Sequence, residues 1–219
     1  DGNSPHAGSD VDCFGGVVTQ VYQGGRPRLV LQDPNHPDGW GGIQVKAWTG
    51  SDTFNRVSTG DWVSVSGVLV EEFRGTTFLQ YGFDGRDSNF QVLSSGNPVP
   101  QPLALDCRQI AAPIKTSTNV WEVADRQAEK YESMRVRVLD VVVAEMDLGK
   151  AVDNYALECA DGNRCWASDY MNLGNTGYYH DLVSLDANFD EVAGILEQYT
   201  GSSDGISWDY YQVLTTQTS

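Results

Sequence analysis

The residues that most often carry out chemistry are sparse in this chain. Three histidines occur in 219 residues, at His6, His36 and His180, and the sequence has no H-E-x-x-H zinc pattern and no phosphate-binding loop. The segment 201–205, GSSDG, fits the G-x-S-x-G pattern with Ser203 at its centre. That nucleophile needs a strand before it and a helix after it, whereas we expect strands on both sides. The adjacent carboxylates at 71 and 72 would point to opposite faces of a strand. We therefore predict no catalytic residue and no enzyme.

Two loops carry oxygen-bearing side chains that calcium could use, because calcium prefers clustered carboxylate and carbonyl oxygens on turns. The residues are Asp33, Asn35 and Asp38 in one loop, and Asp186, Asn188 and Asp190 in the other. Neither set has the EF-hand spacing, and Asp and Asn also serve simply as turn formers. Calcium is thus the one cofactor that the sequence leaves open.

Aromatic and cationic side chains in the first half are candidates for a binding surface. They are Arg28, Trp40, Gln44, Lys46 and Trp48. Aromatic rings beside cations are what base stacking and sugar stacking use. The alternative is that the two tryptophans cover the mouth of a barrel or an interface between domains.

Four cysteines, at positions 13, 107, 159 and 165, allow three disulfide pairings. Cys159 and Cys165 flank a turn sequence and should face each other across a hairpin. That leaves Cys13 to pair with Cys107, and we expect no free thiol. Zinc binding is disfavoured, because a single C-x5-C spacing is a poor match to known zinc sites.

Composition and charge narrow the class of protein. Apolar residues make up 40% of the chain, an ordinary globular value, and no apolar run approaches the ~20 residues that span a bilayer. The net charge of −16 disfavours non-specific binding to phosphate backbones. A first residue other than Met and the expected disulfides predict a secreted, extracellular protein, with the periplasm as the alternative.

The stretch Gly60 to Leu79 organises the predicted fold. Apolar and polar residues alternate from Trp62 onward, which is typical of a half-buried strand, and Arg74-Gly75 forms the turn to a returning strand. Gly67 interrupts the first strand, as glycine does at a bulge or sharp bend.

The remaining segments are also predominantly strand-like. The expected strands are 14–22, 28–32, 42–48 and 90–93 in the first half, and 132–145, 154–159, 165–170, 189–199 and 206–214 in the second. Between them, 94–130 is predicted as a Pro-rich linker with a short helix, because Val120, Val123 and Ala124 have helical spacing.

The central pattern occurs twice. VSVSGVLVEEFRG at 63–75 aligns with DEVAGILEQYTG at 190–201, and each copy is followed by one more strand. We therefore predict an all-β chain of two tandem OB-like five-stranded Greek-key barrels. The expected parts are a polar N-terminal tail at 1–10, barrel 1 at 11–93, the linker at 94–130 and barrel 2 at 131–219.

Several segments resemble a known group of proteins. Five segments look like the tandem OB-fold segments of large secreted bacterial endonucleases and related extracellular proteins. They are GVVTQVYQGG, RLVLQDP, GGIQVKAW, TGDWVSVSGVLVEEFRGTTFL and AEKYESMRVRV. The resemblance covers 14–93 well and 128–214 loosely. In those proteins such segments accompany the catalytic domain and are not catalytic themselves, so the resemblance implies an OB-fold without a reaction centre.

Two functions follow as hypotheses. The first is a structural protein that assembles with copies of itself into an extracellular filament or surface structure, docking its polar N-terminal tail on a neighbour. The alternative is an accessory module that binds single-stranded nucleic acid or polysaccharide through the aromatic and cationic residues of the first half.

Overall fold

The computed structural model describes residues 3–23, 25–83, 85–146, 148, 154–168 and 183–217. The chain divides into two compact units. The first comprises residues 1–101 together with 133–135, and the second comprises 102–132 together with 136–219. The segment predicted as a linker is thus shared between the units, with its larger part, from Pro102 onward, in the second.

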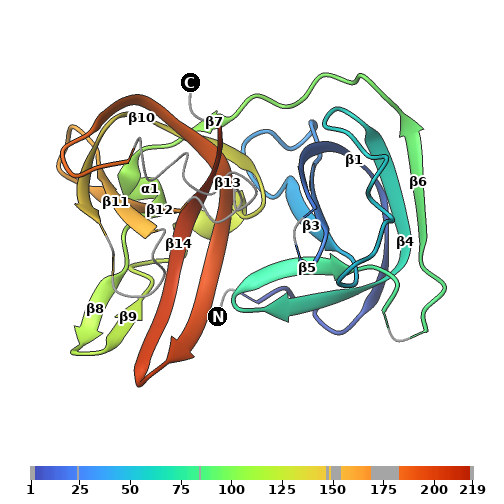
Figure 1. Cartoon of the computed structure of the whole chain (residues 1–219), viewed down its shortest axis with the longest axis horizontal. Coiled ribbons are helices and arrows are strands. Elements are labelled where there is room, and N and C mark those ends of the chain that lie inside the picture. The colour runs from blue at the N-terminus through green and yellow to red at the C-terminus, as the bar shows by residue number, and fades with distance from the viewer. Residues whose placement is uncertain are drawn as a thin grey trace. The chain divides into compact units, whose positions relative to one another are not determined.

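The first unit is built on a closed ring of five strands (Figure 1). They are β1 (Asp10–Tyr22), β2 (Arg28–Gln32), β3 (Gly42–Lys46), β4 (Trp62–Phe73) and β5 (Thr76–Gln80). The order is β1-β2-β3-β5-β4, and β4 pairs back onto β1. The β3–β5 pair is parallel and the other pairs are antiparallel. This is the strand order of an OB-fold, and β6 (Asn89–Ser94) extends the sheet beside β4.

Gly67 has the role that the sequence predicts. Its φ of +64° is one that residues with a Cβ rarely adopt, and an added Cβ would lie 2.7 Å from the carbonyl oxygen of Asp87. β4 can therefore bend here and pair with β1, β5 and β6 along its length.

The N-terminal tail lies along its own barrel. The amide of Gly8 donates to the carbonyl of Val70 at 2.8 Å, and the amide of Val70 donates to the carbonyl of Ser9 at 2.9 Å. Further out, the amide of Ser4 donates to the Glu72 carboxylate at 2.8 Å. The tail is thus held by β4, and its order does not need a neighbouring copy.

The second unit repeats the ring. Its strands are β10 (Arg135–Met146), β11 (Asn154–Glu158), β12 (Arg164–Ser168), β13 (Asn188–Ser203) and β14 (Ile206–Gln217). The order is β12-β11-β10-β13-β14, closed by a parallel β12–β14 pair. The prediction of two OB-like barrels is confirmed. Of the strand expected at 165–170, residues 169 and 170 lie outside the described residues.

Short elements precede this second barrel. They are β7 (Leu103–Ala104), α1 (Cys107–Ile110), β8 (Ile114–Ser117), β9 (Val120–Glu122) and the 3₁₀ helix η1 (Gln127–Tyr131). In the part of the chain that the structure describes, no helix combines the length and the apolar character needed to cross a membrane.

The helical spacing around Val120 is misleading. Val120 to Glu122 form β9, which pairs in parallel with β14, while β8 returns beside it as a hairpin. Strands β13 and β14 run on beyond the barrel as a long hairpin (Figure 1), so the edge of β14 offers backbone groups that β9 satisfies. Tertiary pairing here overrides the local pattern.

The disulfide prediction is wrong in both pairs. Cys107 is bonded to Cys159, and Cys13 and Cys165 are free. Cys165 stands opposite Leu157 in the β11–β12 ladder, so it is out of register with Cys159 across the hairpin. Cys13 lies on β1 of the first unit, where it pairs with Val65 of β4, whereas Cys107 begins α1 in the second unit.

Candidate ligand-binding groove

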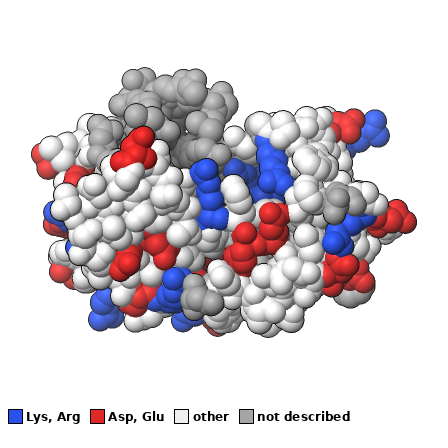
Figure 2. Space-filling view, turned by 90° about the horizontal axis from the view of Figure 1, so that it is seen from below, with Lys and Arg blue, Asp and Glu red and all other residues white. Residues whose placement is uncertain are grey.

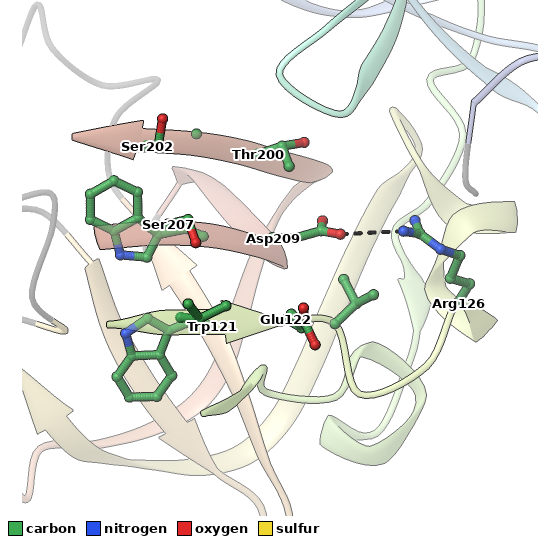
Figure 3. Close-up of a pocket in the computed structure, with 11 residues that line it drawn as sticks. Trp121, Glu122, Arg126, Thr200, Ser202, Ser207 and Asp209 are labelled. Atoms are coloured by element: carbon green, nitrogen blue, oxygen red, sulfur yellow. Dashed lines mark hydrogen bonds and ion pairs between the residues drawn. The ribbon is translucent and has the colours of Figure 1, made fainter. Parts of the chain in front are cut away.

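A groove of about 610 Å³ lies where β9 runs beside the β13–β14 hairpin in the second unit. The polar residues that line it are Glu122 on β9, Arg126 after β9, Thr200 and Ser202 on β13, and Ser207 and Asp209 on β14. Figure 3 shows these side chains along the three adjacent strands, with Arg126 approaching Asp209 from the connecting segment.

Strand register explains why these side chains share a face. Ser202 pairs with Ser207, and Thr200 pairs with Asp209, which is the pair two positions further from the turn. Because side chains alternate between faces of a sheet, the intervening pair, Gly201 with Trp208, belongs to the other face. β9 continues the pattern, since Trp121 stands in register with Trp208.

The alternate positions of these strands carry an aromatic cluster, and its members Trp121 and Trp208 also line the groove (Figure 3). The members of the cluster are Trp121, Trp166, Tyr199, Trp208 and Tyr210. Ring centroids are 4.6 Å apart for Trp166 and Tyr210, and 5.8 Å apart for Trp121 and Trp166. Such contacts stabilise packing beyond the burial of area alone. The cluster therefore provides a rigid base for the polar face of the groove.

Asp209 is the most constrained group in the groove. Its Oδ2 lies 3.2 Å from Nη2 of Arg126, and its Oδ1 accepts a hydrogen bond from Gln198 at 2.5 Å. Both carboxylate oxygens are therefore occupied. The side chain of Glu122, by contrast, is exposed and has no hydrogen-bond or ion-pair partner among the described residues. Its carboxylate is free to accept hydrogen bonds from a ligand.

The groove can therefore bind but has little with which to react. Its hydroxyl groups, on Thr200, Ser202 and Ser207, can both donate and accept hydrogen bonds, and the Glu122 carboxylate can accept them. Among the described residues of the lining, the one cation is Arg126, which is paired with Asp209. Histidine and cysteine do not occur among the lining residues that the structure describes. This chemistry suits a neutral ligand rich in hydroxyl groups.

Two neighbouring tyrosines of β14 are strongly perturbed. Burial raises the pKa of Tyr210 above the usual range, although a hydrogen bond from Asn154 at 3.0 Å opposes the shift. Burial also raises the pKa of Tyr211, and Glu129, which accepts a hydrogen bond from its hydroxyl at 2.5 Å, raises it further. Both side chains are neutral in the folded protein at pH values where an unfolded tyrosine has ionised.

The second unit should consequently lose stability in alkali. An unfolded tyrosine ionises near a pKa of about 10, so the stability that these tyrosines contribute is complete below that pH and is lost above it. Each should lower the free energy of unfolding by about 1.4 kcal/mol per pH unit above that value. Urea denaturation at increasing alkaline pH measures this slope. Tyr211→Phe should reduce it, and Tyr81→Phe, in the other unit, serves as the control. An unchanged slope in Tyr211→Phe would contradict the assignment.

Of the residues proposed from the sequence for a binding surface, three are buried and the other two are exposed but lie apart, and ligand binding by them stays a prediction. Arg28, Gln44 and Lys46 are brought together on β2 and β3 but are buried. Arg28 donates to Gln44 at 3.4 Å, and the Lys46 ammonium lies 3.9 Å from the centroid of the Phe78 ring. These contacts within the first unit occupy side chains that we expected to face a ligand.

The two tryptophans of that set are exposed but separated. Trp40 is 72% exposed and lies in the loop beyond the Gln32 end of the β2–β3 ladder, whereas Trp48 is 50% exposed and follows the Lys46 end. Trp48 stacks on Phe83, with ring centroids 4.7 Å apart, and its indole N–H donates to the carbonyl of Gly82. The two rings therefore cannot both stack on one small ligand.

The calcium candidates act as turn formers. Oδ1 of Asp33 accepts hydrogen bonds from both the amide and the side chain of Asn35, each at 2.9 Å. In the other loop, Asn188 donates to the backbone carbonyl of Asp186 at 3.0 Å. No three His, Cys, Asp or Glu side chains lie close enough to hold a metal in the part of the chain that is described. Calcium binding by either set, Asp38 and Asp190 included, stays a prediction.

Sequence reasoning missed the groove. Glu122 and Arg126 both lie in the segment 94–130, which was predicted as a linker with a short helix. A usable signal was present: Thr200, Ser202, Ser207 and Asp209 alternate with glycine, serine and tryptophan on either side of the turn at Asp204 and Gly205. That alternation predicts a polar face on a two-stranded hairpin.

Comparison with known proteins gives little beyond this geometry. No protein-family model and no curated protein matches the chain. Among solved structures, a murine DNA-binding protein bound with double-stranded DNA is 9% identical, with a TM-score of 0.41 over 94% of this chain and 100% of that one. The tetrameric p202 HIN2 is 11% identical, with a TM-score of 0.37 over 97% and 95%. Fission yeast Pot1 with single-stranded DNA is 13% identical, with a TM-score of 0.33 over 99% and 82%.

These likenesses are too weak to carry an argument about fold or function. The OB-like assignment therefore depends on the strand order of the two rings. The OB-fold part of the resemblance seen in the sequence is confirmed, and the relation to secreted endonucleases stays a prediction.

Proposed function

We propose that this chain is a non-catalytic binding module that holds a neutral polysaccharide in the groove between β9 and the β13–β14 hairpin. The observation that carries the proposal is the row of hydroxyl side chains beside the carboxylate of Glu122, which has no partner among the residues that the structure describes. Sugar hydroxyls are good partners for both kinds of group, because they donate to carboxylates and exchange hydrogen bonds with serine and threonine. Secretion, which the sequence predicts, belongs to the same proposal.

The position of the groove supports this function. OB-folds bind oligonucleotides and oligosaccharides through the face of strands 2 and 3 and through the loops joining strands 1–2 and 4–5. In the second unit, β13 and β14 are the fourth and fifth strands of the barrel, and the groove lies on their projecting hairpin. β9 widens this hairpin into a three-stranded platform.

Charge favours a neutral ligand over nucleic acid. The net charge of −16 repels a phosphate backbone, and the described residues of the groove include one arginine against two carboxylates. On the face shown in Figure 2, Lys and Arg side chains lie among Asp and Glu side chains. Binding along a phosphate backbone uses a tract of unpaired cations, and the described part of the groove lining has no such tract.

The order of the N-terminal tail no longer favours the filament hypothesis. An ordered polar tail suggested docking on a neighbour, but the hydrogen bonds to Val70 and Glu72 account for that order within one chain. Self-assembly stays a prediction from the sequence, and polysaccharide binding is the function that the geometry supports better.

A pair of adjacent substitutions tests the groove. Ser202→Trp places a large ring inside it, whereas Ser203→Trp places the same ring on the opposite face of β13, since neighbouring strand residues alternate. We expect Ser202→Trp to weaken binding by about tenfold or more, a loss of about 1.4 kcal/mol, and Ser203→Trp to leave binding unchanged. The measurement is isothermal titration calorimetry with soluble neutral glucans, mannans and xylans.

Parallel titrations with poly-dT and with an acidic polysaccharide complete the experiment. Salt-sensitive binding of poly-dT that Ser202→Trp leaves intact, with no binding of any neutral glycan, would overturn the proposal. Equal losses of glycan affinity in Ser202→Trp and Ser203→Trp would also contradict binding in the groove.

A further inference from the structure

Three of the four cysteines meet in one place in the second unit. Cys107 begins α1, Cys159 directly follows β11, and Cys165 lies on β12. Cys107 is bonded to Cys159. The free thiol of Cys165 lies 3.1 Å from Sγ of Cys107 and is completely buried. Sγ of Cys107 therefore has two candidate disulfide partners close to it, Cys159 and Cys165.

Hydrogen bonds fix this arrangement. The amide of Ala112, just beyond α1, donates to the carbonyl of Arg164 on β12 at 2.7 Å. At the start of α1, the amide of Cys107 lies 3.1 Å from Sγ of Cys159. The short helix is thus held between the end of β11, which Cys159 follows, and the start of β12, where Cys165 lies. The Asp106–Gln109 capping box holds its first turn.

We infer that Cys107 is a shared disulfide partner, which can exchange its bond with Cys159 for a bond with Cys165. In this exchange the Cys165 thiolate attacks Sγ of Cys107, the Cys107–Cys159 bond breaks, and the electron pair leaves on Sγ of Cys159. Cys159 then takes up the proton that Cys165 lost. One disulfide and one thiol are present before and after, so no oxidant or reductant is consumed.

The exchange moves the free thiol to a different environment. Cys165 is completely buried, whereas Cys159 is only partly buried. Burial raises the pKa of Cys165 far above that of an ordinary thiol, so its reactive thiolate is rare while the site is closed. The exchange should therefore be slow at neutral pH and faster in alkali, and the exchanged form should present Cys159 to thiol reagents.

Peptide mapping of single variants tests the inference. The full chain is used with Cys13→Ser as background, which removes the cysteine of the first unit. After the thiols are blocked with N-ethylmaleimide in acidic denaturant, linked peptides are identified by mass spectrometry without reduction. We expect Cys165→Ser to retain the Cys107–Cys159 bond and Cys159→Ser to form a Cys107–Cys165 bond. Blocked, unlinked Cys107 in folded Cys159→Ser would overturn the inference.

A second measurement uses the Cys13→Ser background without further change, so that a folding defect of Cys159→Ser cannot decide the result. The protein is incubated in mild alkali with a trace of glutathione as exchange catalyst and is then mapped in the same way. Both linkages of Cys107 should be found, and the fraction with Cys165 should rise with incubation until it is constant. Detection of the Cys107–Cys159 linkage alone, at every time point, would contradict a shared partner.

Discussion

Replacing Gly194 with alanine should be among the most damaging single changes in the second unit. A Cβ on Gly194 would lie 2.1 Å from the carbonyl oxygen of Leu214 and 2.6 Å from its carbonyl carbon. Both are backbone atoms of the paired strand β14, so they cannot move aside as a flexible side chain would. The strands also shift register at Ala193/Gly194, which marks a bulge.

We expect Gly194→Ala to lower the free energy of unfolding by about 3 kcal/mol or more, because the strands must separate or the bulge must move. Urea denaturation followed by circular dichroism measures the loss, and amide hydrogen exchange assigns it to the second unit. Gly205→Ala is the matched control. Gly205 has a φ of +76° but no atom within 4 Å of an added Cβ, so only conformational strain of about 1–2 kcal/mol applies there. Equal losses at both positions would contradict the close approach of the two strands.

Phe54→Ala should have a comparable effect on the first unit. Phe54 lies in the connection between β3 and β4, is 0% exposed, and packs with Leu29, Val45 and Val63 in the barrel core. Its ring is edge-on to that of Phe90, with centroids 5.4 Å apart. Removing a buried phenyl ring costs about 3–5 kcal/mol, because the cavity left behind cannot close completely.

The control for this change is Phe73→Ala. Phe73 ends β4 and is 48% exposed, so its loss should change the free energy of unfolding by about 0.5 kcal/mol. Urea denaturation with hydrogen exchange in the first unit again gives the comparison. If Phe54→Ala were no more destabilising than Phe73→Ala, the connection between β3 and β4 would not contribute to the core.

Much of the fold could be read from local pattern. The alternation around Val63 and Val65 and the glycines at 67 and 194 predicted bent strands, and the structure has β4 and β13 at these places. β2 was predicted with the same bounds that it has, Arg28–Gln32. These features depend on side-chain alternation and backbone sterics, which nearby residues determine.

The groove could not be read in the same way. Glu122 and Asp209 are 87 positions apart and line one groove only because β9 pairs with β14. The burial of Arg28, Gln44 and Lys46 was not predicted for a related reason, since it depends on what packs over the strands. The cysteine pairing likewise depends on the position of α1, which the sequence around Cys107 does not reveal.

By itself, the sequence determined two β-barrels of one strand order, because alternation, glycine positions and turn residues act over short distances in the chain. Tertiary structure alone decided which hairpin would acquire a third strand, which sulfur atoms would meet and which polar residues would line one groove. Those outcomes depend on unsatisfied strand edges and on packing between segments that are far apart in the chain. No local pattern specifies which distant segment will pair with a given edge or pack against a given strand.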